Sequence, residues 1–465
     1  MTPPSTTMTD AASRRLLVVA DSDSYVKWGA ALASTLPATW TSRLVIIASP
    51  VMPSGRQLAD ALAGTRFTAS DARVIHLDEL DALVDDLDPH AVLLSLRGPF
   101  VRVVAPRLEA RDRRPALVSG FPGLTIPAVP KAVVYREQTD LVVLHSRHEV
   151  REFRAIAADL DVDRRFGLAT LPFLATDAAG GSRDGLRPPR PSEGSPRPSE
   201  GSPRPSEGDR SDVVFAAQAK VPAARDDRVR VLEALAAHAR RHPERRVVVK
   251  VRARRGEAQT HAEEHDYADL LGDLAERVPP NLVVEDGPMA EKLARASALV
   301  TVSSTAALEA VALGIPALLL DDFGVSPAMI NTVFEGSGLF GSTEDLVEGR
   351  FRHADAAWLA DNYFHGRGAD DWIGRLHALA EAREIVPLPR LDRRHDLAGG
   401  PLRAAYERRR MLGAYDRSLL GAAAWGLGLA ARGVVRRVRR LRRRTLSRRA
   451  PCAPRRASGS GPRCA

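Results

Sequence analysis

Residues Leu299 to Leu320 read LVTVSSTAALEAVALGIPALLL and contain a complete strand–helix–strand unit. An apolar, β-branched run ends in the polar triplet Ser303–Thr305, and a segment with helical spacing follows at once. Gly314 and Pro316 then end the helix and precede a second apolar run. Two short apolar strands joined by a helix are typical of a parallel α/β sheet.

The same alternation of apolar runs and helical segments extends over residues 14–174 and again over residues 213–320. We therefore predict an α/β protein with two Rossmann-like, doubly wound parallel sheets that face a cleft. In such sheets ligands bind beyond the carboxyl ends of the strands. Functional side chains are accordingly expected in the loops that follow the strands.

A repeat separates the two halves. The unit Arg-Pro-Ser-Glu-Gly-Ser-Pro begins at Arg190 and again at Arg197, and proline and glycine in every unit exclude a helix. We expect a flexible linker that spans about 30 Å. The predicted parts are a disordered N-terminus at 1–13, a first domain at 14–178, the linker at 179–211, a second domain at 212–380, a helical and loop connection at 381–414, and a basic amphipathic or disordered tail at 415–465.

The net charge is concentrated at the C-terminus. The 465 residues carry 67 Lys and Arg against 58 Asp and Glu, a formal charge of +9. Residues 432–465 hold 13 Arg and no acidic residue, which leaves residues 1–431 at −4. The basicity therefore belongs to a tail and not to the folded halves. Nucleic-acid binding is not expected, because no aromatic interleaving or readout module accompanies the arginines.

The chain has features of a cytoplasmic protein. Its two cysteines, Cys452 and Cys464, lie in the basic tail, so neither a disulfide framework nor a cysteine zinc site is expected in the folded halves. No signal-peptide core or membrane-spanning apolar run is present. Residues 415–449 suit a helix at the surface of an anionic membrane, which predicts peripheral attachment at its inner face. A solubilising tail is the alternative.

The triplet Ser303, Ser304 and Thr305 is the strongest candidate for a ligand contact. Hydroxyls and unpaired backbone N–H groups at the start of a helix bind anions, and Glu309 lies one turn further, within reach of a ribose hydroxyl. In the alternative interpretation Ser304 is a helix cap and Glu309 is a solvated helix residue.

The arrangement of Ser303–Thr305, Glu309, Ala310, Gly314 and Pro316 resembles the nucleotide-binding half of GT-B glycosyltransferases, which carries a hydroxyl-rich loop, a Glu-Ala pair and Gly-x-Pro before a strand. It is most similar to bacterial capsule and envelope polysaccharide transferases that use CMP- or CDP-activated donors. The resemblance implies transfer of a sugar from a nucleotide donor to a cell-envelope or polysaccharide acceptor, with the nucleotide-sugar as co-substrate and no cofactor.

Two alternatives to this function remain open. One is different chemistry on the same fold, such as a nucleotide-sugar epimerase or a polyol-phosphate transferase. The other is a non-enzymatic protein that binds membrane or nucleic acid through the basic tail.

Cations follow two strands of the second half and suit a donor phosphate held without an obligatory metal. Gln218 and Lys220 follow the first strand, with Arg225 beyond them, and Lys250 and Arg252 end the next strand. An exposed sheet edge is the alternative interpretation of these cations.

Two motifs imitate metal sites. His261, Glu264 and His265 fit a zinc string, but they lie in a polar stretch, so we expect a donor-site loop with Thr260 and His261 near phosphate or sugar. Asp21-Ser-Asp23 imitates a manganese motif but follows the first strand of the chain. It fits the first loop of the acceptor half, where serines cap a helix or Asp23 acts as base or acceptor contact.

Further candidates end strands of the first half. Arg97 and Gly120 are expected on the acceptor side, and His145 is a second candidate for the catalytic base beside Asp23. The alternative is that a single histidine or arginine at a strand end is structural.

Overall fold

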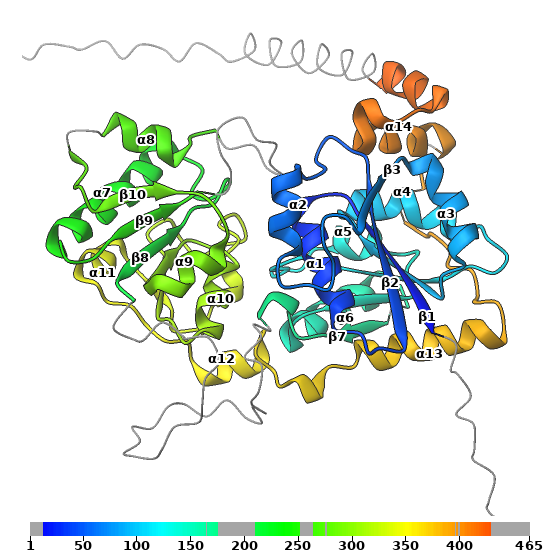
Figure 1. Cartoon of the computed structure of the whole chain (residues 1–465), viewed down its shortest axis with the longest axis horizontal. Helices are drawn as coiled ribbons and strands as arrows, with labels where there is room; N and C mark the ends of the chain where they lie inside the picture. Colours follow the sequence, from blue (N-terminus) through cyan, green and yellow to red (C-terminus); the bar gives the residue numbers. More distant parts are fainter. Residues whose placement is uncertain are drawn as a thin grey trace, which may run out of the picture. The chain divides into compact units, whose positions relative to one another are not determined.

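The computed structural model describes residues 13–163, 165–174, 210–251, 264–274, 277–395, 397–398 and 400–428 (Figure 1). Residues 1–397 form one compact unit and residues 398–465 a second. Most of the predicted linker, the first 12 residues and the tail beyond residue 428 lie outside the described residues. In the part of the chain that is described, no helix is long and apolar enough to cross a membrane.

The first half is built on a seven-stranded parallel sheet in the order β3-β2-β1-β4-β5-β6-β7. The central strand β1 is buried from Leu16 onward, as its apolar, β-branched sequence predicts. Starting from β1, the chain moves outward to one edge and then returns to build the other, which is the doubly wound topology. The strands are β1 (Arg14–Ala20), β2 (Trp40–Ile47), β3 (Ala72–Ile75), β4 (Ala91–Ser95), β5 (Ala116–Gly120), β6 (Leu141–Leu144) and β7 (Phe166–Leu168).

Helices connect these strands. Sequence caps fix where several of them begin: the Ser54 and Gln57 side chains form a capping box for α2, and the Ser146 hydroxyl accepts the Glu149 N–H at the start of α6. The helical segments are α1 (Asp23–Ser34), α2 (Gly55–Leu62), η1 (Leu77–Glu79), α3 (Leu80–Leu87), α4 (Gly98–Glu109), α5 (Pro130–Val134), α6 (Arg147–Asp159) and η2 (Pro172–Leu174).

The second half repeats the plan with a six-stranded parallel sheet in the order β10-β9-β8-β11-β12-β13. Strands and helices alternate along the chain as the sequence predicts. The strands are β8 (Asp212–Ala216), β9 (Val247–Lys250), β10 (Leu282–Glu285), β11 (Ala296–Thr301), β12 (Ala317–Leu320) and β13 (Phe340–Gly341). The helical segments are α7 (Arg225–Arg241), α8 (Tyr267–Asp273), α9 (Met289–Arg295), α10 (Ala306–Ala312), η5 (Thr332–Phe334) and α11 (Thr343–Glu348).

The chain returns to the first half after the second sheet. It passes through α12 (Ala356–Asp361) and η6 (Arg367–Ala369) into α13 (Trp372–Ile385), whose Trp372, Leu376 and Ala380 are buried in the core of the first sheet. The sequence boundary at residue 380 assigned these residues to the second domain. The structure corrects it, because α13 covers apolar residues of the first sheet that would otherwise face water.

The second compact unit follows. Its described part contains α14 (Gly400–Leu412), η7 (Gly413–Tyr415) and a further helical segment at residues 419–428.

Candidate functional site

The loops that follow β8 and β11 are joined by one glutamine. The Gln218 Nε2 donates to the Ser303 carbonyl at 2.6 Å, and the Ser303 N–H donates to Gln218 Oε1 at 2.7 Å. The side-chain amide of Gln218 therefore satisfies both the backbone N–H and the backbone carbonyl of Ser303. Because β8 and β11 are neighbours in the sheet, this pairing fixes the two loops relative to each other. The sequence expected these residues at the same edge, and the structure brings them together.

A third loop is attached to the same serine. The Ser303 hydroxyl donates to the carbonyl of Ile330, in the segment that follows β12. Ile330 has a φ of 59°, a left-handed conformation that is costly for a β-branched residue. The next residue, Asn331, is buried, and its side chain bonds the backbone of Ser326 and Gly324 at 3.0 and 3.1 Å. The surrounding hydrogen bonds thus hold a strained backbone in place.

The rest of the triplet lies directly before α10. The Ser304 hydroxyl accepts the Ala306 N–H at 3.2 Å, and the N-cap of the helix is Thr305, which makes no side-chain capping bond. Glu309 is not a solvated helix residue: its side chain is 15% exposed, and its carboxylate lies 3.8 Å from the Lys27 ammonium of α1. Glu309 therefore lies beside a cation contributed by the first half.

Arg228, which was not predicted as a site residue from the sequence, anchors the loop that carries Gln218. Its Nε donates to the Pro222 carbonyl at 2.9 Å, and one terminal nitrogen donates to the carbonyls of Gln218 and Ala219 at 3.0 and 2.8 Å. The other terminal nitrogen donates to the His265 carbonyl at 2.5 Å. Planar guanidinium donors suit such a set of acceptors better than a lysine ammonium does.

The sequence did contain a signal for Arg228. The positions three, four and seven residues later in α7 are Val231, Leu232 and Leu235, and all are buried. Helical spacing therefore placed Arg228 on the apolar face, where an arginine needs several hydrogen-bond acceptors.

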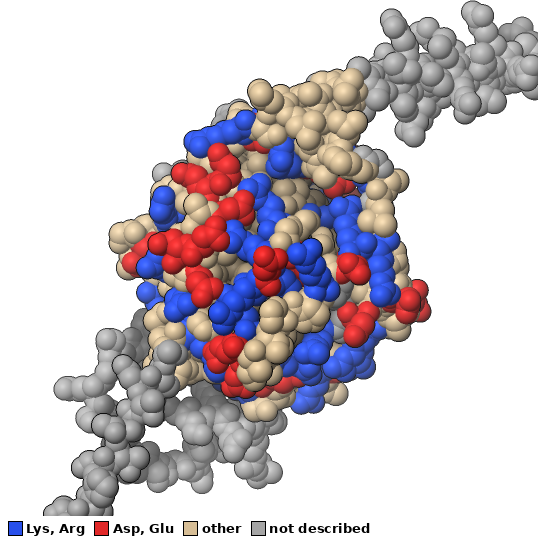
Figure 2. Space-filling view, turned by 90° about the vertical axis from the view of Figure 1, so that its right-hand side faces the viewer, with Lys and Arg blue, Asp and Glu red and all other residues tan. Residues whose placement is uncertain are grey.

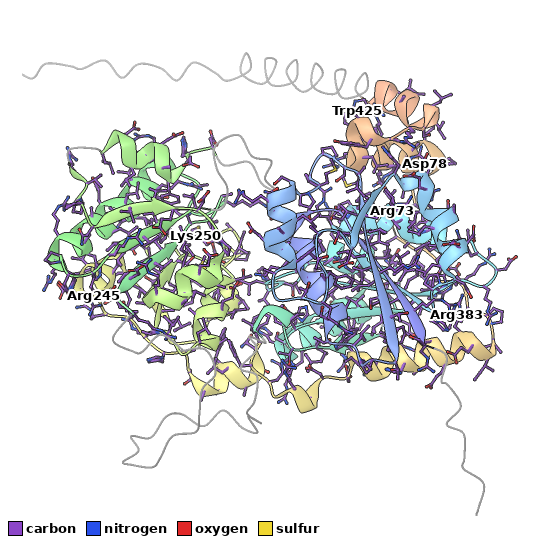
Figure 3. The ribbon with its side chains drawn as sticks, viewed as in Figure 1. Arg73, Asp78, Arg245, Lys250, Arg383 and Trp425 are labelled. Carbon is purple, nitrogen blue, oxygen red and sulfur yellow. The ribbon has the colours of Figure 1, made fainter. Side chains whose placement is uncertain are left out.

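The other residues predicted to bind the donor lie in different surroundings. Lys220 is exposed in the Gln218 loop, and Lys250 ends β9 (Figure 3). Arg225 forms a 3.0 Å ion pair with Asp273 on the protein surface. Three predicted donor residues lie outside the described residues: Arg252, Thr260 and His261.

On the acceptor side, Arg97 is paired with the buried carboxylate of Asp21. The Arg97 Nε lies 2.6 Å from Asp21 Oδ2, and one terminal nitrogen of Arg97 is buried without a hydrogen-bond partner among the described residues. Burial raises the pKa of Asp21, and the Arg97 charge opposes this rise only in part. Asp23, two residues later, is half-buried and opens α1. The N-cap, Ser22, makes no side-chain capping bond there.

Gly120 is enclosed by packing. A Cβ at this position would lie 2.5 Å from the Trp28 ring and 2.7 Å from the Val143 carbonyl. The Gly120 carbonyl accepts an N–H of the buried Arg136 at 2.9 Å. The Trp28 ring and the Val143 backbone thus approach the Gly120 backbone so closely that a side chain would not fit at this position.

His145 has both ring nitrogens occupied. The Trp28 indole N–H donates to its Nε2 at 2.7 Å, and its Nδ1 lies 2.9 Å from the Ala169 carbonyl. The ring is fully buried, and burial lowers the pKa of His145. These contacts require a neutral imidazole with the proton on Nδ1. They favour the structural interpretation of His145, because neither nitrogen is open to an acceptor hydroxyl.

A family comparison identifies the class of protein. A family model described as "Putative glycosyltransferase (DUF6716)" matches residues 16–379. The chain belongs to this family. The matched residues include both parallel sheets, so the predicted resemblance to glycosyltransferases and the predicted fold of two Rossmann-like parallel α/β sheets are confirmed. A comparison with curated protein sequences gives no match.

Solved structures with a similar course of the chain include two epimerases and a glycosyltransferase. The UDP-GlcNAc 2-epimerase from Neisseria meningitidis bound to UDP-GlcNAc is 14% identical, covering 80% of this chain and 98% of that chain, with a TM-score of 0.46. The UDP-GlcNAc 2-epimerase from Methanocaldococcus jannaschii is 10% identical, with coverages of 78% and 99% and a TM-score of 0.47. The spinosyn rhamnosyltransferase SpnG is 16% identical, with coverages of 80% and 97% and a TM-score of 0.37.

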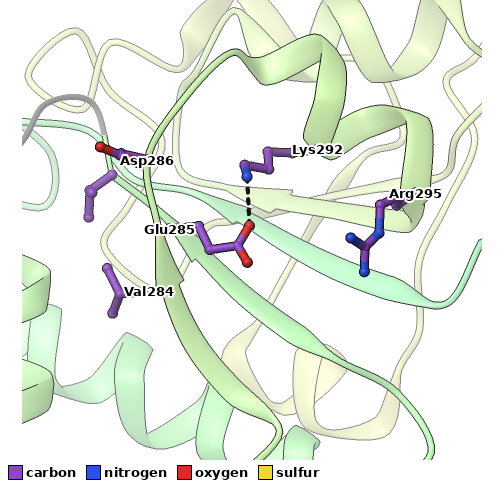
Figure 4. A pocket seen from close by; sticks show the side chains of 6 residues that line it. Val284, Glu285, Asp286, Lys292 and Arg295 are labelled. Carbon is purple, nitrogen blue, oxygen red and sulfur yellow. Dashed lines mark hydrogen bonds and ion pairs between the residues drawn. The ribbon is translucent and has the colours of Figure 1, made fainter.

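The glycosyltransferase also has a polar pocket of about 520 Å³ beside β10 and α9 (Figure 4). Lys292 lies 2.6 Å from Glu285, and this contact lowers the pKa of the Glu285 carboxyl. The Lys292 and Glu285 charges therefore neutralise each other. Neither Gln218 nor Ser303 lines the pocket, so it is separate from the three joined loops. Its lining residues are Val251, Val284, Glu285, Asp286, Lys292 and Arg295.

A buried contact ties the returning segment to the first half of the glycosyltransferase. The Tyr363 hydroxyl donates to Glu149 Oε1 at 2.7 Å, and Glu149 Oε2 accepts the backbone N–H of His145 at 2.8 Å. Burial raises the pKa of Tyr363 well above its usual value. In the described ranges, no three His, Cys, Asp or Glu side chains are grouped so that they could hold a metal ion.

Proposed function

We propose that this glycosyltransferase takes a sugar from a nucleotide-activated donor bound by its second half. The observation that supports this best is the set of three loops joined through Ser303, with Gln218 on one side and Ile330 on the other. A rigid polar edge at the carboxyl ends of parallel strands is where doubly wound folds bind nucleotides. Arg228 holds the first of these loops through hydrogen bonds to the Gln218 and Ala219 carbonyls.

The donor phosphate would be neutralised by side-chain cations in place of a metal. Lys220 is exposed on the Gln218 loop, and Lys250 ends the adjacent strand. Arg252 continues from that strand in the sequence. Fixed positive charge that faces a leaving phosphate stabilises the charge that develops when the glycosidic bond breaks. The co-substrate is the nucleotide-sugar, and no further cofactor is proposed.

The acceptor would bind at the loops of the first half, with Asp23 as the base. Asp23 follows Asp21, whose carboxylate is held by Arg97, so the backbone that carries Asp23 is anchored. A carboxylate within reach of an acceptor hydroxyl removes its proton as the oxygen attacks the anomeric carbon. We propose a cell-envelope or polysaccharide acceptor and a cytoplasmic location at the inner face of the membrane.

Product analysis with the full-length protein tests this function. Candidate nucleotide-sugars would be incubated with cell-envelope glycan or lipid-linked acceptor, and the products separated. We expect release of free nucleotide together with a glycosylated acceptor. Interconversion of the donor sugar without any acceptor would contradict transfer and indicate an epimerase.

Lys220→Ala tests the phosphate contact, with Lys131→Ala as the matched control, because both lysines are exposed and Lys131 lies in the first half. The first variant should raise the KM for the donor about tenfold, as expected for the loss of one charge-assisted contact of about 1.4 kcal/mol. Equal KM values in the two variants would contradict the role of Lys220.

A further inference from the structure

The last described helix packs against α14 through its small residues. Trp425 stacks on Tyr406 with ring centroids 5.2 Å apart, and a Cβ at Gly428 would lie 2.5 Å from the Tyr406 ring. Gly421 lies against the Asp416 carboxylate, and Ala424 is buried. Gly421, Ala424, Trp425 and Gly428 therefore form the packed face of residues 419–428.

The opposite face of this helix is apolar and exposed. Leu419, Leu420 and Leu427 are 89%, 50% and 63% exposed. At about 100° per residue, these leucines and Ala423 fall within about 100° of the helix circumference, apart from the packed face. Residues 419–428 contain no charged side chain. We call Leu419, Leu420, Ala423 and Leu427 the leucine face. In Figure 2 the uppermost part of the coloured surface is tan, the colour of residues other than Lys, Arg, Asp and Glu.

The sequence that follows supplies a strong positive charge. Residues 432–465 contain 13 Arg and no acidic residue, and the first of them is five positions after Leu427. An anionic membrane surface has a layer of lipid phosphates outside a layer of acyl chains. The arginines suit the phosphates, and the apolar side chains suit the acyl chains. The described part of this helix is about 15 Å long and arginines begin at residue 432, so we place the helix in the interface and not across the bilayer.

We propose that the leucine face inserts into the surface of an anionic lipid bilayer and that the arginines after it bind the lipid headgroups. This deepens the peripheral attachment included in the proposed function, because it names the inserted side chains. Nucleic acid would bind the arginines but offers the leucines no apolar layer. In a symmetric pair of chains joined through the leucine face, the two arginine-rich segments would follow the same surface and repel each other.

Vesicle sedimentation of the full-length protein tests the proposal. We expect binding to vesicles of phosphatidylcholine with 30% phosphatidylglycerol, and at least tenfold weaker binding to pure phosphatidylcholine. Leu419→Ser with Leu427→Ser should weaken binding to the anionic vesicles at least fivefold. Ile385→Ser is the matched control, because Ile385 is 81% exposed on α13 and should leave binding unchanged.

The outcomes separate the inserted face from the charge. If the double leucine variant binds as the wild type does while Arg442, Arg443 and Arg444 changed together to Gln abolish binding, the charge alone attaches the protein and the leucine face is ruled out. Absence of binding, equal binding to neutral vesicles, or retention by duplex DNA in preference to vesicles would also overturn the proposal. Unchanged thermal unfolding of each variant shows that folding is intact. Sugar transfer measured with soluble acceptor reports separately on the proposed enzyme function.

Discussion

The side-chain amide of Gln218 pairs with both backbone groups of Ser303, through hydrogen bonds of 2.6 and 2.7 Å. The pairing closes the gap between two neighbouring loops at the carboxyl edge of the second sheet. Since the Ser303 hydroxyl holds a third loop through Ile330, one serine position links three loops. This is the structural reason to assign donor binding to this edge.

Replacement of Gln218 by Ala should destabilise the protein. The Ser303 peptide groups would lose their partner while remaining largely buried, which costs about 1–3 kcal/mol in the free energy of unfolding. Urea unfolding measures the change. Gln138→Ala is a suitable control, because the Gln138 side-chain amide donates to the Leu391 carbonyl at 3.2 Å and does not join two strand-end loops. Equal losses in the two variants would contradict the special role of the Gln218 pair.

Arg228→Lys should impair donor binding more than turnover. Lysine keeps the charge but cannot reach the carbonyls of Pro222, Ala219 and His265 with one planar group. We expect the donor KM to rise about tenfold and kcat to change less than threefold, because the loop is displaced while the reacting groups remain. Initial-rate kinetics over donor concentration give the two constants.

Arg240→Lys is the control for this experiment, since Arg240 lies on the same helix with its side chain at the surface. If Arg228→Lys lowers only kcat, or lowers stability without any effect on the donor KM, then Arg228 does not position the donor loop.

The buried imidazole of His145 should make stability depend on pH. Burial lowers the pKa of His145 below its unfolded value near 6.5, although the Glu149 charge partly opposes the shift. Below pH 6.5 His145 binds a proton in the unfolded chain but not in the folded protein. Stability is therefore retained above pH 6.5 and falls by about 1.4 kcal/mol per pH unit below it, until the folded pKa is reached.

His145→Gln removes this dependence while offering an amide to the Trp28 and Ala169 partners. The slope of unfolding free energy between pH 6.5 and 5.5 should flatten by about 1 kcal/mol per unit relative to the wild type. His238→Gln provides a comparison, because burial also lowers the pKa of His238, on α7. An unchanged slope in His145→Gln would show that His145 is not a buried neutral group.

Asp23→Asn should slow sugar transfer without weakening donor binding. Loss of a general base reduces kcat by about 10²–10⁴-fold. Rates measured at saturating donor, with donor affinity determined by calorimetry, separate the two effects. Asp60→Asn, at an exposed position of α2, serves as the control. A kcat that falls less than threefold would exclude Asp23 as the base.

Both sheets could be predicted from the sequence because each buried parallel strand is a short run of apolar, β-branched residues that can be recognised locally. The sequence did not predict β13 or the return of α13, since a two-residue strand has no period and the partner of a helix depends on distant residues. The contact between Glu149 and Tyr363 spans 214 positions and has no local signal at all.

The candidate site was predicted unevenly for a related reason. Gln218 and Ser303 were expected at one edge because parallel strands bring their carboxyl ends together. His145 and Gly120 have the same position at strand ends, but their contacts belong to packing in the first half. Sequence places a residue at the end of a strand without showing whether it faces ligand or core. Arg228 was recoverable, since its spacing from Val231 and Leu235 marks the buried face of α7.

Calorimetric titration of the wild type and Gln218→Ala with CMP, CDP, UDP, TDP and their sugar conjugates tests the central claim most directly. We predict that at least one nucleotide or nucleotide-sugar binds the wild type with micromolar affinity and binds the folded variant at least tenfold more weakly. Failure of every ligand to bind the wild type, or equal affinity in the two proteins, would contradict a donor site built on the Gln218 and Ser303 loops.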